Sequence, residues 1–148
     1  MISIKALNND QRGSSLVEFA IGATIFITVM FAILEFGRAL LVHNALTDAA
    51  RRGARYAVVH TAADADAVKN VVVYGDSAGG TKPVVDNLTT ANVTVTYSNF
   101  GLDGGTVAVS ITNYQFQFIL PLVGTMIQMP NYTTTLTGES AGLIPPNI

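Results

Sequence analysis

The sequence contains no cysteine, and only 12% of its 148 residues are charged. Without cysteine, the chain cannot form a disulfide framework, a thiolate zinc site or a cysteine nucleophile. Because soluble domains have about 25% charged residues, the low charge and a mean hydropathy of +0.41 indicate a membrane-associated chain. A net charge of −2 with a pI of about 5.5 argues against a nucleic-acid partner.

Proline is absent before Pro83, so no proline interrupts a helix in the N-terminal half. Residues 19–34 form an uninterrupted run of 16 uncharged, mostly apolar residues, FAIGATIFITVMFAIL. Residues 14–18 extend the run, with Glu18 as its only charge. The extended run has about 21 residues, which at 1.5 Å per residue spans the roughly 30 Å hydrocarbon core of a bilayer.

This apolar run has two alternative interpretations, a buried core helix and a signal peptide. The remaining chain is too small and too polar to cover a helix that is apolar on every face. A signal peptide requires a small-residue cleavage site after the run, whereas this sequence continues as Glu35-Phe36-Gly37-Arg38. We therefore predict a membrane span at about residues 16–35.

The helical pattern continues beyond the span as an amphipathic segment over residues 36–60. One face is apolar or small at spacings of three and four: Val42, Ala45, Leu46, Ala49, Gly53, Tyr56 and Ala57. The other face is polar, with Asn44, Asp48, Arg51, Arg52 and Arg55. Three acid-first pairs are expected to stabilise the helix, namely Glu35–Arg38, Asp48–Arg51 and Asp48–Arg52. The sequence thus predicts one long helix over residues 14–60.

Residues 61–148 are predicted to form a globular head with mixed elements. The expected elements are a short helix at 62–73 with Thr61 as its N-cap, strands at 93–97 and 107–111 joined by a turn at 99–105, a bend near 112–113, a helical stretch from Leu120-Pro121 to Ile127, and a last strand at 132–137. The fold class is α+β: a long N-terminal helix, membrane-spanning and then amphipathic, packs against a small antiparallel β-sheet head with a short second helix.

No catalytic or metal-binding motif emerges from the sequence, so we predict neither an enzyme nor a cofactor. His43 and His60 lie 17 residues apart and belong to no cluster of ligands. The loops 76–80 and 103–105 contain aspartate and glycine. They lack the ligand spacing of an EF-hand, and turn formation explains their composition.

Three sequence features together resemble known pilins. Gly13, a five-residue step to Glu18 and a hydrophobic helix resemble the prepilin cleavage motif of the type IV pilin superfamily. Residues 13–59 further resemble the TadE-like family, the minor pilins or pseudopilins of tight-adherence (Tad, type IVc) pili. The segments 35–38 (EFGR) and 48–57 (DAARRGARYA) carry this resemblance. More loosely, the segments 107–111 and 120–122 (LPL) agree with it.

The resemblance implies a processing site and a subunit contact. A prepilin peptidase is expected to remove the leader, residues 1–13, by cleaving after Gly13. Ser14 then carries the new N-terminal amine, and Glu18 of a neighbouring subunit pairs with that amine. The alternative from the residues alone is that Glu18 is an acid tolerated near the membrane interface, where a helix N-terminus favours negative charge.

The resemblance also implies a function and a location. The expected function is assembly of a Tad pilus used for adherence or secretion. The chain is expected to cross the bacterial inner membrane once, to export its head to the periplasm or outside, and to enter a pilus. Its partners are then membrane lipid, other pilin or pseudopilin subunits, prepilin peptidase and the Tad assembly platform, with no nucleic acid. The alternative is a permanently anchored single-pass protein whose exported head recruits a partner.

Positive residues flank the predicted span on both sides. Lys5 and Arg12 precede it, and Arg38, Arg51 and Arg52 follow it. Their number does not favour a cytoplasmic N-terminus, whereas the resemblance implies an N-in, C-out orientation. We adopt the latter because the arginines after the span lie on a helix with paired acids.

Overall fold

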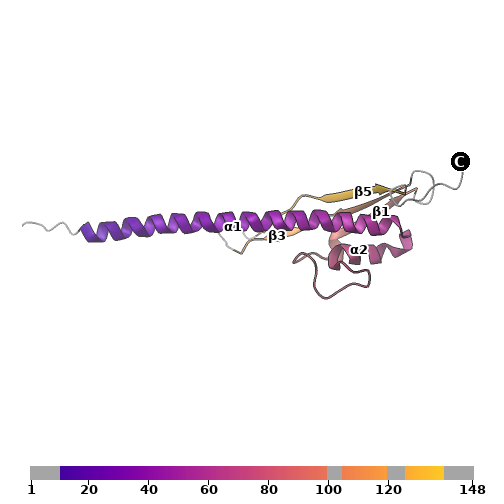
Figure 1. Cartoon of the computed structure of the whole chain (residues 1–148), viewed down its shortest axis with the longest axis horizontal. Helices are drawn as coiled ribbons and strands as arrows, with labels where there is room; N and C mark the ends of the chain where they lie inside the picture. Colours follow the sequence, from indigo (N-terminus) through magenta and orange to yellow (C-terminus); the bar gives the residue numbers. More distant parts are fainter. Residues whose placement is uncertain (1–10, 100–104, 120–125, 139–148) are drawn as a thin grey trace, which may run out of the picture. The chain divides into compact units, whose positions relative to one another are not determined.

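The computed structural model describes residues 11–99, 105–119 and 126–138. The chain divides into two compact units, one ending at Gly37 and the other beginning at Arg38. Helix α1 (Gln11–Val58) contributes residues to both, and it is the indigo-to-magenta helix in Figure 1. The prediction of one uninterrupted long helix is therefore confirmed.

The first unit consists, in its described part, of the N-terminal portion of α1. From Gly13 to Gly37 none of its residues is buried, and Ala23 and Glu35 are the two that are partly covered. The large apolar side chains in this stretch therefore find no core within the described part of their own chain.

The second unit is an α+β fold built from short elements, which confirms the predicted fold class. After α1 the elements are the 3₁₀ turn η1 (Ala62–Asp64), α2 (Ala65–Tyr74), the 3₁₀ turn η2 (Thr90–Asn92), β1 (Val93–Ser98), β2 (Thr106–Ile111), β3 (Gln115–Gln117), β4 (Met126–Gln128) and β5 (Tyr132–Thr137). The first sheet has the order β1-β2-β5 and is antiparallel throughout. The second sheet pairs β3 with β4, also antiparallel.

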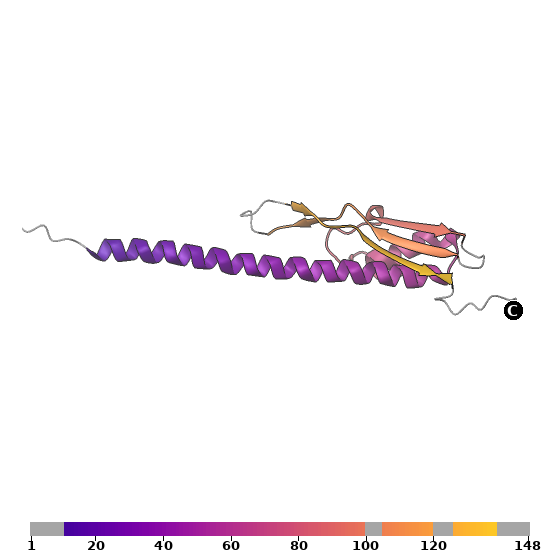
Figure 2. The same ribbon diagram turned by 90° about the horizontal axis from the view of Figure 1, so that it is seen from above.

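The core of the second unit lies between the C-terminal part of α1, helix α2 and the three-stranded sheet. Figure 2 shows the strands of this sheet running beside that part of α1. The main buried side chains are Leu46, Ala49, Ala50, Ala54 and Ala57 of α1, Val68, Val72 and Val73 of α2, Val107, Val109 and Ile111 of β2, and Phe116 of β3. Because the face of α1 is built from small residues, the neighbouring elements approach its backbone closely.

Gly53 marks the closest of these approaches. A Cβ atom at this position would overlap Cγ2 of Val72 and lie 3.3 Å from Cγ1 of Val109. Glycine is therefore required by packing, since both neighbours are branched side chains of the buried core.

Local signals in the sequence predicted several of these elements correctly. The predicted helix at 62–73 consists of η1 followed by α2, and Thr61 is the N-cap of η1. There the Thr61 N–H donates to Oδ2 of Asp64 at 3.2 Å. The strand alternation at 93–97 and 107–111 corresponds to β1 and β2, which pair in register from Val93–Ile111 onward. The expected bend is present at Asn113, whose φ of 58° lies in the left-handed region and interrupts the extended backbone between β2 and β3.

The predicted helical stretch ending at Ile127 is wrong in its described part. Residues 126–128 are strand β4, whose Ile127 pairs with Phe116 of β3. Pairing with β3 satisfies the backbone of this segment, and a short apolar window cannot reveal that distant partner. Residues 120–125 and most of the predicted turn at 99–105 lie outside the described residues.

Candidate functional site

The N-terminal part of α1 exposes a continuous apolar surface. Among its side chains, Leu16 is 70% exposed, Phe19 75% and Ile33 65%. A helix that is apolar on all sides requires a bilayer or other helices around it. This helix is long and apolar enough to cross a membrane by length and composition.

Two polar side chains within this surface satisfy their own hydrogen bonds. The Thr24 hydroxyl donates to the carbonyl of Ala20, and the Thr28 hydroxyl donates to that of Thr24, both at 2.8 Å. Each threonine thus uses the carbonyl four residues back, which hides its donor without help from water. The apolar surface is consequently compatible with hydrocarbon along this stretch.

Glu18 differs from these threonines because its carboxylate makes no hydrogen bond within the described residues. Its side chain is exposed, and the described residues offer it no hydrogen-bond or ion-pair partner. A carboxylate at this position interrupts the apolar surface between Val17 and Phe19, where charge is costly in lipid.

The predicted processing residues lie at the start of α1. Gly13 and Ser14 are exposed residues of the helix, which begins at Gln11. A Cβ at Gly13 would meet nothing within 4 Å. Unlike Gly53, Gly13 is therefore not required by packing, although glycine inside a helix costs about 1 kcal/mol relative to alanine.

The charged residues expected to pair along α1 have different surroundings. Asp48 and Arg51 form an exposed ion pair with an N–O distance of 3.7 Å. Arg52 instead reaches the last turn of α2, where its Nε donates to the carbonyl of Val71 at 3.2 Å. Its Nη2 lies 3.5 Å from the carbonyl of Val72. A guanidinium at these carbonyls caps α2 and complements the negative end of its dipole.

Arg38 of α1 contacts strand β3 of the second sheet. Its Nη2 donates to the carbonyl of Gln117, and its guanidinium carbon lies 4.3 Å from the ring centroid of Phe116. Phe116 is buried and packs edge-to-face on Phe118, with centroids 5.2 Å apart. Glu35, the expected partner of Arg38, is partly covered. Sequence spacing alone does not reveal the contact of Arg38 with β3, because 79 residues separate the two groups.

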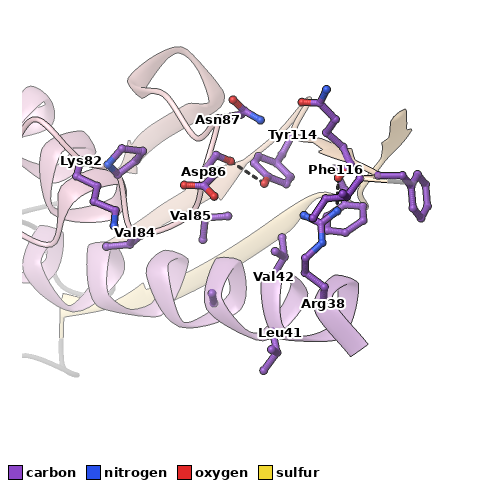
Figure 3. Close-up of a pocket in the computed structure, with 15 residues that line it drawn as sticks. Arg38, Leu41, Val42, Lys82, Val84, Val85, Asp86, Asn87, Tyr114 and Phe116 are labelled. Atoms are coloured by element: carbon purple, nitrogen blue, oxygen red, sulfur yellow. Dashed lines mark hydrogen bonds between the residues drawn. The ribbon is translucent and has the colours of Figure 1, made fainter. Parts of the chain in front are cut away.

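Next to this contact, the second unit contains a groove with a volume of about 710 Å³. Figure 3 shows Arg38 and Phe116 at one end of it and Lys82 at the other. Between them the Tyr114 hydroxyl donates to the carbonyl of Asp86 at 2.8 Å. Burial, and then the nearby charge of Asp86, raise the pKa of Tyr114 above its ordinary value. The sequence does not reveal this groove, because α1, residues 82–87 and β3 come together only in the folded chain.

The two histidines make contacts within the second unit. Nδ1 of His43 lies 2.9 Å from the Tyr132 hydroxyl, which links α1 to β5. His60 stacks on Tyr56 with ring centroids 3.8 Å apart, and its Nδ1 lies 2.7 Å from the Tyr56 carbonyl. Within the described ranges, no group of three or more His, Cys, Asp or Glu side chains is placed to hold a metal ion.

Comparison with known proteins finds one similarity, in the N-terminal part of the chain. Residues 13–55 match the family model described as TadE-like protein, which confirms the predicted resemblance over less than a third of the chain. No curated protein and no solved structure matches this chain. The TadE-like proteins are a structural, non-enzymatic family of pilin-like proteins associated with Tad pili. Together with the long apolar helix, the match indicates a single-pass membrane protein.

Proposed function

We propose, from the TadE-like match at residues 13–55, that this chain is a pseudopilin or minor pilin that enters or primes a Tad pilus used for adherence or secretion. Residues 1–13 are a leader that prepilin peptidase removes. Residues 16–35 hold the chain in the bacterial inner membrane, and residues 61–148 form a head exported to the periplasm or outside. The partners are other pilin or pseudopilin subunits and the Tad assembly platform.

The observation that carries this proposal is the Glu18 carboxylate, which has no partner among the described residues and is the only charge in the stretch 14–34 of α1. After cleavage at Gly13, the Ser14 amine is a cation at the end of the same helix. In a bundle of such helices, the amine of one subunit and the Glu18 carboxylate of the next can neutralise each other. This pairing removes two charges that would each be costly alone in an apolar interface.

Gly13 supports the processing step. Because a side chain at Gly13 would meet no atom of the described fold, packing does not explain glycine there. A peptidase that needs an unobstructed backbone at the scissile bond does explain it. The bond lies near the start of α1, where helix ends fray readily and can open into a protease.

The test compares three carboxylate variants of the full chain in cells that assemble the pilus. Glu18→Gln leaves the neighbour's amine unpaired, and breaking a buried pair costs about 3–5 kcal/mol. That cost corresponds to roughly two to three and a half factors of ten in each assembly equilibrium. Membrane insertion and cleavage should stay normal while incorporation into sheared pili falls sharply. Glu18→Asp should be intermediate, because it keeps the charge with a shorter reach.

Asp48→Asn is the matched control, since it removes an exposed carboxylate from the same helix. Immunoblots of membrane and sheared-pilus fractions should show wild-type incorporation for this variant. Equal incorporation of Glu18→Gln and wild type contradicts the pairing mechanism.

A second candidate function is a permanently anchored protein whose head recruits a partner. The groove favours it, because Lys82 and Asp86 line this concave surface and their charged groups have no partner among the described residues. The mass of the mature chain separates the two functions. Loss of residues 1–13 supports the pilin, and retention of those residues supports the permanent anchor.

A further inference from the structure

Besides the groove, the second unit contains a smaller concavity of about 330 Å³ that is lined almost entirely by carboxamide side chains. We name it the carboxamide pocket. The described residues that line it are Asn87, Asn92, Asn113, Gln115, Gln117 and Met126. Five of these six are asparagine or glutamine, and none of the six is charged. The pocket is therefore rich in hydrogen-bonding groups and has no charge in its described lining.

Three of the lining residues share one face of the second sheet. Gln115 and Gln117 are exposed and flank the buried Phe116 of β3, so their side chains point to the same side. Met126 is the cross-strand partner of Gln117, and directly paired residues of an antiparallel sheet lie on one face. Ile127 pairs with Phe116 on the opposite face and does not line the pocket. The strand pair thus presents two carboxamides and one thioether to the pocket.

Hydrogen bonds hold the loops around the pocket. The Asn92 carboxamide accepts from the backbone N–H of Thr89 at 3.0 Å and donates to the carbonyl of Thr112 at 3.1 Å. It also donates to the carbonyl of Asn113 at 3.3 Å. Asn87 and Asn113 adopt left-handed backbone conformations, with φ of 65° and 58°, which asparagine tolerates better than most residues. The loops are thus fixed within the fold before a ligand binds.

Four carboxamides of the pocket have unused hydrogen-bonding capacity, namely those of Asn87, Asn113, Gln115 and Gln117. All four residues are exposed, and their side chains make no hydrogen bond to another described residue. Each carboxamide has two N–H donors and one carbonyl oxygen that can accept two hydrogen bonds. The pocket therefore offers neutral donors and acceptors side by side.

The composition of the lining restricts the class of ligand. Small-molecule pockets have volumes of about 300–1,000 Å³ and are lined mostly by apolar side chains, with few polar groups. The carboxamide pocket has a volume at the lower end of this range but a polar lining. An apolar ligand would leave the carboxamides without partners, which is costly. An ionic ligand would find no opposite charge among the described lining residues. The ligand that fits is therefore neutral and rich in both donors and acceptors.

We infer that the carboxamide pocket binds a neutral saccharide. Each sugar hydroxyl donates one hydrogen bond and accepts others, and a carboxamide can pair with it in both ways. The C–H groups of a sugar ring can pack against the exposed Met126, since methionine adapts to irregular surfaces. An extended peptide instead requires pockets for alternate side chains, and Met126 is the single apolar side chain in the described lining. The inference goes beyond the proposed function and does not rest on it, because every described lining residue belongs to the second unit.

The test measures glycan binding by the full chain. The protein is reconstituted in nanodiscs of phosphatidylcholine, whose headgroup contains no sugar, and is applied to an array of neutral and acidic oligosaccharides. Gln115→Ala and Gln117→Ala are combined in one variant. Because both side chains are exposed, this double variant should fold normally, and an unchanged urea midpoint checks that it does. Asn44→Ala is the matched control, since it removes an exposed carboxamide of α1 that does not line the pocket.

The wild type and Asn44→Ala should bind the same neutral oligosaccharides with equal affinity. Loss of two neutral hydrogen bonds should weaken the affinity of the double variant by about 5- to 150-fold, measured by isothermal titration with the best-bound oligosaccharide. The wild-type affinity should stay constant between about 0.05 and 0.5 M NaCl, because salt screens only interactions between charges.

Several results would overturn the inference. They are absence of binding to every neutral oligosaccharide, binding to acidic oligosaccharides alone, an affinity that falls with salt, and equal affinity of the double variant and the wild type. Displacement of the bound sugar by a lower concentration of a neutral Ser/Thr peptide would overturn it too, since an extended chain would then be the occupant. None of these results bears on incorporation of the Glu18 variants into pili, so the inference and the proposed function can fail separately.

Discussion

Replacement of Gly53 by alanine tests the packing on which the second unit depends. The new methyl group would overlap Cγ2 of Val72 and lie 3.3 Å from Cγ1 of Val109. Both valines are fully buried, so neither can move away into solvent. Either α2 and the sheet must separate from α1, or the valine side chains must leave their preferred rotamers.

The net cost follows from two opposing effects. Overpacking of a tight core costs about 1–3 kcal/mol, whereas replacing glycine by alanine in a helix gains about 1 kcal/mol. We therefore expect Gly53→Ala to lower the unfolding free energy by about 0–2 kcal/mol. Gly37→Ala is the matched control on the same helix. A Cβ there meets nothing within 4 Å, so stability should be unchanged or slightly higher.

A double variant identifies Val72 as the source of the clash. Val72→Ala alone creates a cavity and destabilises the core, but it also makes room for a methyl group at Gly53. The two changes should therefore cost less together than the sum of their separate costs, with a coupling of about 0.5–3 kcal/mol. Strict additivity would contradict the contact between Gly53 and Val72.

The assay is urea unfolding of the detergent-solubilised full chain followed by tyrosine fluorescence. All five tyrosines lie between residues 56 and 132, so the signal reports the second unit and not the apolar N-terminal helix. The reasoning is refuted if Gly53→Ala is more stable than both the wild type and Gly37→Ala.

Three further predictions concern processing, folding and pH. Gly13→Val should insert into the membrane but keep its leader, because a branched side chain obstructs the scissile bond; N-terminal sequencing that finds Ser14 in this variant would contradict cleavage at Gly13. A fragment that begins at Thr61 should show no cooperative thermal transition, because it lacks the buried face of α1 against which α2 and the sheet pack. Burial raises the pKa of Tyr114 above its ordinary value of 10.0, so its contribution to stability is complete below pH 10 and is lost as the pH rises toward the folded-state pKa. Urea midpoints that do not fall above pH 10 would contradict this last prediction.

Sequence patterns predicted the elements whose causes are local. Helix α1 follows from an apolar run without proline, and β1 and β2 follow from strict alternation. The bend at Asn113 follows from a change of parity between Ile111 and Tyr114, which a strand accommodates by a bulge or a bend. Each of these elements is determined by residues that are close together in the sequence.

The contacts that depend on distant partners were not predictable in this way. Arg52 was expected to pair with Asp48, but it caps α2, because the carbonyls of Val71 and Val72 come within its reach only after folding. Strand β4 was read as helical because its partner β3 lies across residues 118–125. The groove is formed by three segments that are separate in the sequence, so no single motif predicts it.

The exposure of the apolar helix has a consequence for the energetics of polymer growth. Lipid tails are about as apolar as leucine. Moving this helix from a bilayer into a bundle of similar helices therefore exchanges one apolar environment for another. Because no apolar surface leaves or enters water in this exchange, the hydrophobic effect contributes little to its free energy. For the proposed pilin, transfer of residues 16–35 into the bundle and back into the bilayer would then have nearly equal free energies. In the proposed pilus, the direction of assembly would therefore have to come from external work and not from burial of this helix.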